Sequence, residues 1–251
     1  MKEALIVGGA NGIGLAIAME LAARSDMRCV HIVDKSPLSE EYRRDNVRSY
    51  EFDLTQEDYS FFDQFQSIDT LFISAGFGRL ALFKDIDEKL ISSYFSVNTV
   101  ASIRILKHFY NRLESSAPFY CGTMVSISGF LSSPFFSVYG ATKAAMRFFI
   151  ESVNVELSKA GTQNRILNVS PGSIKGTSFN QGVTDLGQTK VLAQEIIGHL
   201  QKHNDLFIPL YEEIFKGVLE RYHSDFRAEG LRSYDYKLNS GRMSKETAKT
   251  L

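Results

Sequence analysis

Short apolar runs alternate with amphipathic segments along most of this 251-residue sequence. Seven runs are short and apolar enough to predict buried strands, and turn-forming or small polar residues follow them. The predicted strands are Ala4–Val7, Cys29–Val33, Val47–Phe52, Thr70–Ile73, Tyr120–Ser126, Arg165–Val169 and Leu206–Ile208. Between them, apolar residues recur three and four positions apart, which predicts helices. The main predicted helices are Ile13–Ser25, Asp87–Leu113, Ser137–Leu157, Val191–Leu200 and Tyr211–Tyr222.

The alternation of strands and helices determines the predicted fold class. Strands that are joined through helices form a parallel sheet, and the helices then cover both of its faces. We therefore predict an α/β protein with a single doubly wound (Rossmann) domain over residues 1–251. Its sheet is expected to be mostly parallel and seven-stranded, and ligands are expected at the carboxyl ends of the strands.

Two segments lack this periodicity. Residues 173–190 are rich in Gly, Ser and Thr, which predicts a mobile loop of the kind that closes over ligands. Residues 224–251 are largely polar, so we expect a polar C-terminal tail whose last residues are loosely held.

Composition narrows the classes of partner and compartment. The chain is 44% hydrophobic and 23% charged, as is usual for a soluble globular protein, and its net charge of −1 gives no reason to expect nucleic acid or an anionic membrane as a partner. The longest apolar runs have the length of strands, so no membrane-spanning helix is predicted. The two cysteines, Cys29 and Cys121, lie in strand-like runs, which favours free thiols in a reducing cytoplasm. The five histidines form no H-E-x-x-H motif, so no metal site is predicted.

A glycine-rich turn, GGANGIG, joins the first predicted strand to the first predicted helix at Gly8–Gly14. Glycines at such a turn allow a dinucleotide pyrophosphate to approach the positive end of the helix. Asp34 ends the second strand 20 residues beyond Gly14, where a carboxylate accepts hydrogen bonds from the adenosine ribose and repels a 2′-phosphate. This predicts a preference for NAD over NADP, which the neighbouring Lys35 partly offsets. The alternative is that Asp34 serves only as a turn or cap residue.

Tyr139 and Lys143 lie four residues apart at the start of an amphipathic helical segment. On a helix this spacing places both side chains on one face, about 5–6 Å apart at Cβ. A nearby ammonium favours the ionised phenol, so Lys143 is expected to lower the pKa of Tyr139 from its usual value of about 10. Tyr-x-x-x-Lys also arises by chance, so the pair gains weight only from its surroundings. Asn98, in the middle of the helix before, either faces water or makes a buried hydrogen bond.

Several of these motifs together resemble the short-chain dehydrogenase/reductase family, over about Lys2 to Pro209. Gly8, Gly12 and Gly14 match the three glycines of T-G-x-x-x-G-x-G, with Val7 in place of the Thr. Ser74-Ala75-Gly76 resembles N-A-G, and YGATK at Tyr139–Lys143 matches the Y-x-[AS]-[ST]-K core. The resemblance implies binding of NAD(P) by Gly8, Asn11, Gly12, Ile13, Gly14, Asp34, Asp53, Leu54, Ala75, Gly76, Tyr139, Lys143, Pro171, Gly172 and Ile174.

The resemblance also implies the catalytic residues Tyr139, Lys143, Ser126 and Asn98. Tyr139 would pass a proton to or from the substrate oxygen, Lys143 would lower the pKa of Tyr139 and bind the nicotinamide ribose, and Asn98 would hold a water. An ungapped register places Ser126 as the serine that binds the substrate oxygen, whereas a gapped alignment on the strand pattern favours Ser128.

The implied function is an NAD(P)-dependent oxidoreductase that transfers a hydride between the nicotinamide and a small alcohol or carbonyl substrate. A non-catalytic dinucleotide sensor and an epimerase, dehydratase or lyase on the same scaffold are the alternatives. The apolar residues on the helices suggest a homodimer or homotetramer, with Phe148, Phe149 and Val153 as candidates for the seam. Phe130, Phe135, Phe136 and Phe179 suggest an apolar wall of the substrate pocket.

Overall fold

A wholly parallel sheet of seven strands forms the centre of the computed structural model, which describes residues 1–177, 179 and 182–240. The strands are β1 (Glu3–Val7), β2 (Cys29–Asp34), β3 (Val47–Glu51), β4 (Thr70–Ile73), β5 (Tyr120–Met124), β6 (Ile166–Val169) and β7 (Leu206–Phe207). Their order is β3-β2-β1-β4-β5-β6-β7, so the direction of winding reverses between β1 and β4. The predicted α/β fold class is confirmed, and all seven predicted strands are present.

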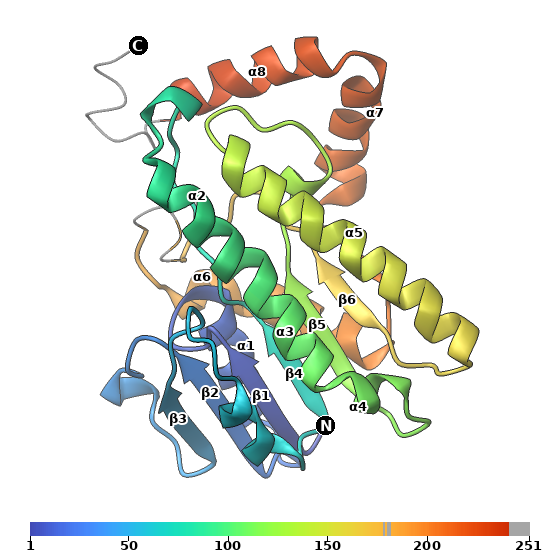
Figure 1. Cartoon of the computed structure of the whole chain (residues 1–251). Helices are drawn as coiled ribbons and strands as arrows, with labels where there is room; N and C mark the ends of the chain where they lie inside the picture. Colours follow the sequence, from blue (N-terminus) through green and yellow to red (C-terminus); the bar gives the residue numbers. More distant parts are fainter. Residues whose placement is uncertain (178, 180–181, 241–251) are drawn as a thin grey trace.

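Helices cover both faces of this sheet (Figure 1). They are α1 (Gly12–Ala22), α2 (Glu88–Phe95), α3 (Ala101–His108), α4 (Tyr110–Glu114), α5 (Ser137–Ala160), α6 (Leu186–Gln201), α7 (Lys216–Ser224) and α8 (Phe226–Leu238). Successive residues of a strand point to opposite faces, so Leu5 and Val7 of β1 pack beneath α3–α5, while Ala4 and Ile6 pack beneath α1 and α6. The chain thus buries one apolar core on each face.

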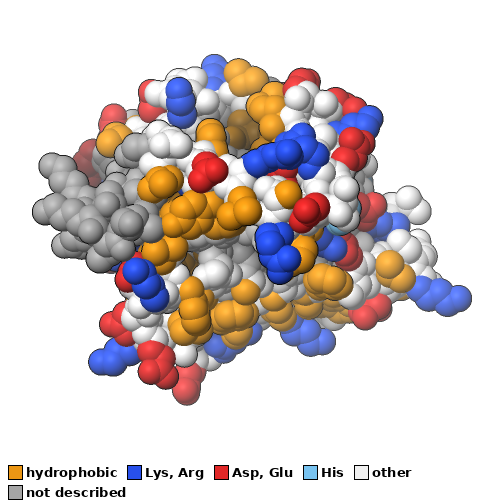
Figure 2. Space-filling model, turned by 90° about the horizontal axis from the view of Figure 1, so that it is seen from above, with side chains coloured by type: hydrophobic (Ala, Val, Ile, Leu, Met, Phe, Trp, Pro, Cys, Tyr) orange, Lys and Arg blue, Asp and Glu red, His pale blue; other side chains and the backbone are white. Residues whose placement is uncertain are grey.

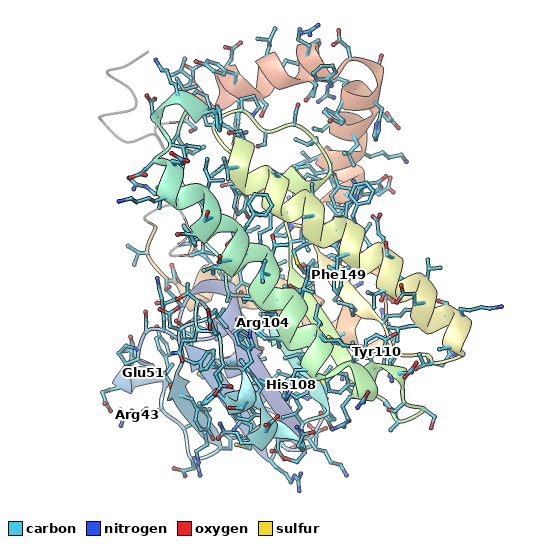
Figure 3. The ribbon with its side chains drawn as sticks, viewed as in Figure 1. Arg43, Glu51, Arg104, His108, Tyr110 and Phe149 are labelled. Atoms are coloured by element: carbon cyan, nitrogen blue, oxygen red, sulfur yellow. The ribbon has the colours of Figure 1, made fainter. Side chains whose placement is uncertain are left out.

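On the α3–α5 face, an aromatic cluster from residues 52–65 extends the core, and α3 is tied to it. The guanidinium of Arg104 lies 3.8 Å from the ring centroid of Tyr59, and His108 lies 3.3 Å from the carboxylate of Asp63. Figure 3 shows Arg104 and His108 on α3, with Phe149 on the neighbouring α5. Val153 is buried in this core and Phe149 is packed against it, whereas Phe148 is exposed, so two of the three residues expected at a subunit seam contribute to the core of the chain itself.

The structure corrects the bounds of two predicted segments. The helix expected over Asp87–Leu113 is interrupted by a π-helical turn at Ser96–Val100 and breaks again at Phe109. The loop expected over 173–190 ends at Asp185, because this side chain accepts a hydrogen bond from the N–H of Gly187 and caps α6.

The polar segment that was predicted from residue 224 contains a helix over Phe226–Leu238. Asp225 accepts hydrogen bonds from the N–H groups of Arg227 and Ala228, and this cap begins α8. Together α7 and α8 lie beyond the carboxyl ends of the strands (Figure 1). The final residues, SKETAKTL, lie outside the described residues. Within the part that the structure describes, no helix has the length and apolar character needed to cross a membrane.

Candidate active site

A cavity of about 1530 Å³ opens at the carboxyl ends of the strands. Its lining includes residues that directly follow β1, β2, β3, β4 and β6, together with the last residue of β5 and those after it. Most of the predicted site residues line it: Gly8, Asn11, Gly12, Ile13, Asp34, Asp53, Leu54, Ala75, Gly76, Ser126, Tyr139, Pro171, Gly172 and Ile174. These residues, which come from separate strand ends and from α5, therefore lie together around one cavity. Gly14, Asn98 and Lys143 are buried behind the lining.

The glycine turn is packed too closely for side chains. Gly8 has a φ of +78°, and a Cβ there would lie 2.3 Å from the backbone nitrogen of Ala75. A Cβ on Gly14 would lie 2.1 Å from the carbonyl oxygen of Gly8, so Gly14 allows α1 to begin directly against the turn. Gly12 has a φ of +55°, and its N–H donates to the Oγ1 of Thr184 at 3.1 Å. The turn therefore presents bare backbone to the cavity at the N-terminus of a helix, which fits a dinucleotide pyrophosphate.

Asp34 is held by the backbone at the end of β2. Its Oδ2 accepts from the N–H of Ala10 at 3.0 Å, and its Oδ1 accepts from the N–H of Ser36 at 3.0 Å. The carboxylate thus serves as a turn residue. It also lines the cavity, as a carboxylate that binds the adenosine ribose would have to. Lys35 lines the same region.

Asp53 follows β3 at the same end of the cavity. It accepts from the N–H and the hydroxyl of Thr55, each at 2.8 Å, and these bonds, led by the backbone N–H, keep the pKa of the carboxyl below its usual value. This end of the cavity therefore carries carboxylates at Asp34 and Asp53.

Tyr139 stands near the N-terminus of α5, with only 8% of its surface exposed. Burial raises the pKa of its phenol to about 12, and a hydrogen bond with Ser126 acts in the opposite direction. The rings of Phe136 and Phe179 lie 5.2 and 5.3 Å from the Tyr139 ring. Tyr139 is therefore a protonated phenol at neutral pH, enclosed by aromatic side chains.

The two candidate serines occupy different positions. The Oγ of Ser126 accepts from the N–H of Ser128 at 3.1 Å, and this hydroxyl acts to lower the pKa of Tyr139. The hydroxyl of Ser128 instead donates to the Oγ of Ser133 at 3.3 Å. The geometry therefore favours Ser126 as the partner of Tyr139.

Lys143 lies one turn further along α5 and behind the cavity wall. Its Nζ donates to the carbonyl of Met124 at 2.8 Å and lies 5.7 Å from the centroid of the Tyr139 ring. Burial lowers the pKa of Lys143 to about 8. The expectation that Lys143 lowers the pKa of Tyr139 is not met in this structure, because burial raises this pKa and the group that acts in the opposite direction is Ser126. A Cβ on Gly76 would lie 3.4 Å from this Nζ, so a glycine leaves room there.

Asn98 makes buried hydrogen bonds, which settles the alternative left open by its sequence. Its Oδ1 accepts from the N–H of Phe77 at 2.9 Å, and its Nδ2 donates to the carbonyl of Phe77 at 2.9 Å and to the Oγ1 of Thr142 at 3.3 Å. It belongs to the π-helical turn and joins the chain after β4 to α5. Its side chain thus fixes the wall beside Tyr139.

The segment after β7 forms a wall that sequence reasoning missed. A Cβ on Gly172 would lie 2.5 Å from the ring of Phe215, so this segment packs directly on the strand end expected beside the nicotinamide. Its cavity-lining residues include Phe215, Arg221, Glu229, Arg232, Tyr236 and Lys237. No motif marked them, because their contributions depend on how α7 and α8 fold back over the sheet. Phe136 and Phe179 line the cavity as expected, whereas Phe130 and Phe135 do not.

Side chains that could bind a metal ion do not cluster in the described part of the chain. Among residues 1–177, 179 and 182–240, no group of three or more His, Cys, Asp or Glu side chains is placed to hold a metal ion. Burial raises the pKa of the Cys121 thiol well above its usual value, and both cysteines are free.

Comparison with known proteins gives a consistent result. The sequence profile of the short chain dehydrogenase family matches residues 2–186. An uncharacterized oxidoreductase of Saccharomyces cerevisiae is 26% identical over 207 residues, which cover 77% of this chain and 66% of that protein, just under two thirds of its length. An uncharacterized oxidoreductase of Staphylococcus epidermidis is 27% identical over 207 residues, which cover 78% and 87%.

Among solved structures, a short chain dehydrogenase/reductase from Burkholderia phymatum in complex with NAD has a TM-score of 0.76 at 17% identity, covering 91% of this chain and 95% of its own. A short chain dehydrogenase from Burkholderia cenocepacia in complex with NADP has a TM-score of 0.74 at 20% identity, covering 93% and 99%. These likenesses support the fold, and the profile match covers most of the sequence. The chain belongs to the short chain dehydrogenase family of oxidoreductases, as its motifs predicted.

Proposed function

We propose that this protein is an NAD(P)-dependent oxidoreductase that interconverts a carbonyl compound and an alcohol, with Tyr139 as the proton donor and acceptor. The observation that carries the proposal is that the buried phenol of Tyr139 and the hydroxyl of Ser126 line the same cavity as the glycine turn. A nucleotide sensor needs the turn but has no use for a buried phenol paired with a hydroxyl. An epimerase or dehydratase is the second chemistry that such a pair allows, and it would leave no net change in the cofactor.

The residues at the turn fit a dinucleotide. Gly8 and Gly12 leave backbone exposed where the cavity meets the helix N-terminus, and Asp34 lies at the end of the next strand. Gly76, Pro171 and Ile174 would hold the nicotinamide half of the molecule at the opposite side of the strand ends. When bound, the nicotinamide supplies or accepts the hydride.

The protein's own residues handle the proton. The pKa of Tyr139, raised by burial, keeps the phenol protonated at neutral pH, so its hydroxyl is ready to donate to a substrate oxygen as a carbonyl is reduced. Ser126 would donate to the same oxygen and orient it toward the phenol. Lys143 and Asn98 stand behind the wall, where Lys143 would bind the ribose and Asn98 holds the backbone at Phe77.

Asp34 supports a preference for NAD. Its carboxylate is fixed by two backbone N–H groups and lines the cavity, so a 2′-phosphate at this position would meet a like charge. Lys35 beside it reduces that repulsion. The proposed preference is therefore a higher affinity for NAD than for NADP.

The test is cofactor oxidation with a panel of aldehydes and ketones, using the wild type and three variants. Tyr139→Phe and Ser126→Ala are expected to lower kcat by roughly 10²- to 10⁴-fold, because each removes a group that acts on the substrate oxygen. Ser128→Ala is the matched control and is expected to keep near-normal activity, since its hydroxyl bonds to Ser133.

Cofactor affinity, measured separately, should be unchanged in all three variants. Near-full activity of Tyr139→Phe would refute the assignment of the proton donor. A larger loss in Ser128→Ala than in Ser126→Ala would move the serine's role to Ser128.

A further inference from the structure

Two arginines from the C-terminal helices face the cavity and share one carboxylate. Arg221 of α7 donates from Nε to Glu229 at 2.7 Å and from Nη2 to the same side chain at 3.1 Å. Arg232 of α8 donates from Nη1 to Glu229 at 3.2 Å. All three residues line the cavity. One carboxylate thus binds two guanidinium groups. The three side chains together keep a net positive charge.

The arginines are accessible, whereas the carboxylate is not. The side chains of Arg221 and Arg232 are 48% and 63% exposed, while that of Glu229 is 9% exposed. A guanidinium carries five N–H donors, and Glu229 engages two of those on Arg221 and one on Arg232. The donors that Glu229 does not engage suit the planar oxygen pairs of a carboxylate or a phosphate.

Charge is distributed unevenly along the cavity. At the end expected to hold adenosine, Asp34 and Asp53 line it. Among the described residues, the one other carboxylate that lines the cavity is Glu229, which is paired with both Arg221 and Arg232. The substrate end is therefore cationic, although the net charge of the whole chain is only −1.

Contacts connect α8, which carries Arg232, to the segment that precedes Tyr139. Lys237 of α8 donates to the hydroxyl of Ser133 at 2.6 Å, and Tyr234 of α8 has its ring 4.5 Å from that of Phe135. The next residue, Phe136, packs against Tyr139. The helix that carries Arg232 is thus anchored to the segment that leads into Tyr139.

Apolar side chains of the same C-terminal segment complete the wall. Leu210, Ile214, Phe215 and Val218 line the cavity. Figure 2, which views the molecule from this end, shows apolar, basic and acidic side chains close together. The lining therefore combines an apolar surface with fixed cationic groups.

We infer that the substrate carries an anionic group, a carboxylate or a phosphate, on an apolar body, and that Arg221 and Arg232 bind this group. The inference rests on the proposed function only in placing the reacting carbonyl at Tyr139. The competing explanation is that Arg221, Glu229 and Arg232 do no more than hold α7 against α8.

The test compares three probes that share one apolar body: benzaldehyde, 4-carboxybenzaldehyde and 4-formylphenyl phosphate. With wild type, kcat/KM is expected to be about 10- to 100-fold higher for an anionic probe than for benzaldehyde, which corresponds to one or two hydrogen bonds to a charged group. The two anionic probes separate carboxylate from phosphate recognition. Added salt should reduce the advantage of the anionic probe, because it screens exposed charges.

Arg221→Met and Arg232→Met should each remove most of that advantage and leave benzaldehyde unaffected, and Arg232→Lys should restore part of it. Arg227→Met is the matched control, since Arg227 lies on α8 but packs over the Phe226 ring and does not line the cavity. A purely structural triad predicts a different result, in which the arginine variants lower activity toward all three probes alike and lower the melting temperature.

A binding measurement separates this inference from the proposed function. Benzoate, phenyl phosphate and benzyl alcohol are titrated into the cofactor-saturated protein and followed by ligand-observed NMR. Preferential binding of an anion, lost in the two methionine variants, supports the inference even if no aldehyde is reduced, which would count against the proposed function alone. Equal or absent binding of the three compounds overturns the inference, and reduction of benzaldehyde would still support the proposed function.

Discussion

Burial acts on Tyr139 and Lys143 in opposite directions. It raises the pKa of the phenol to about 12 and lowers the pKa of the ammonium to about 8, because both groups are easier to bury in their neutral forms. At pH 7 the folded protein therefore carries a buried, charged lysine whose Nζ bonds to the carbonyl of Met124. This arrangement keeps a proton close to the phenol, and it destabilises the folded state at neutral pH.

This destabilisation should appear in the pH dependence of the free energy of unfolding. Lys143 has an ordinary pKa of 10.5, so between about pH 8 and 10 the unfolded chain holds a proton there that the folded chain has lost. The free energy of unfolding contributed by this residue then rises with pH. Above pH 10 the raised pKa of Tyr139 acts in the opposite sense, because the unfolded phenol loses its proton first.

We expect wild type to gain about 2 kcal/mol relative to Lys143→Met between about pH 7 and pH 9.5, measured by urea unfolding without cofactor. Lys159→Met, at the exposed end of the same helix, is the control and should show no such gain. Parallel pH curves for wild type and Lys143→Met would show that Lys143 keeps an ordinary pKa.

At the scale of elements, α8 connects the C-terminal segment to the catalytic helix. Lys237 donates to the Oγ of Ser133 and, at 2.9 Å, to the carbonyl of Pro134. These residues lead directly into α5, so the position of α8 affects the position of Tyr139. Under the proposed function, α8 would therefore act as a positioning element for Tyr139.

Lys237→Met is expected to lower kcat roughly tenfold for every carbonyl substrate, because a small displacement of the phenol weakens proton transfer. Cofactor affinity should not change, since the glycine turn lies at the other end of the cavity. Lys216→Met on α7 is the control, because Lys216 pairs with Glu212 on the surface. Unchanged kcat in Lys237→Met would show that α5 is fixed without this contact.

The strands could be predicted from the sequence, whereas α8 and the π-helical turn could not. All seven strands were predictable, because buried parallel strands appear as short apolar runs that end in turn residues. α8 was not, since the carboxylate of Glu229, and not an apolar stripe, is what it buries. The π-helical turn at Ser96–Val100 gave no signal either, as it depends on Asn98 bonding to Phe77 across the fold.

The candidate site likewise contains residues that local motifs identify and residues that only the folded structure brings together. Local motifs identified the glycine turn, Asp34, Ser126, Tyr139 and Lys143, whose spacing along the chain determines their placement at the strand ends. They gave neither the direction in which burial shifts the pKa of Tyr139 nor the arginines of the C-terminal helices. Both depend on long-range packing, which one sequence does not display.

At the scale of the whole molecule, the cavity crosses the point where the winding of the sheet reverses, between β1 and β4. Open α/β sheets bind ligands at this point, because the neighbouring loops diverge to opposite faces. A ligand bound there contacts both halves of the fold and stabilises them together.

Thermal unfolding should show this stabilisation by the cofactor as a higher melting temperature. NADH at about 100 times its dissociation constant is expected to stabilise the folded state by about 2.7 kcal/mol, which corresponds to roughly 5–10 °C for a domain of this size. NADPH at the same concentration should give a smaller shift because of Asp34, and Asp34→Ser should narrow the difference. Equal shifts for the two cofactors in wild type would contradict the proposed preference for NAD.

The contact between Gly12 and Thr184 links two parts of the molecule that are far apart in sequence. A phosphate that takes the N–H of Gly12 would replace the hydroxyl of Thr184, which belongs to the segment after β6. That segment also supplies Phe179 to the wall around Tyr139. One hydrogen bond thus connects the glycine turn at one end of the cavity to the segment that supplies an aromatic side chain at the other end.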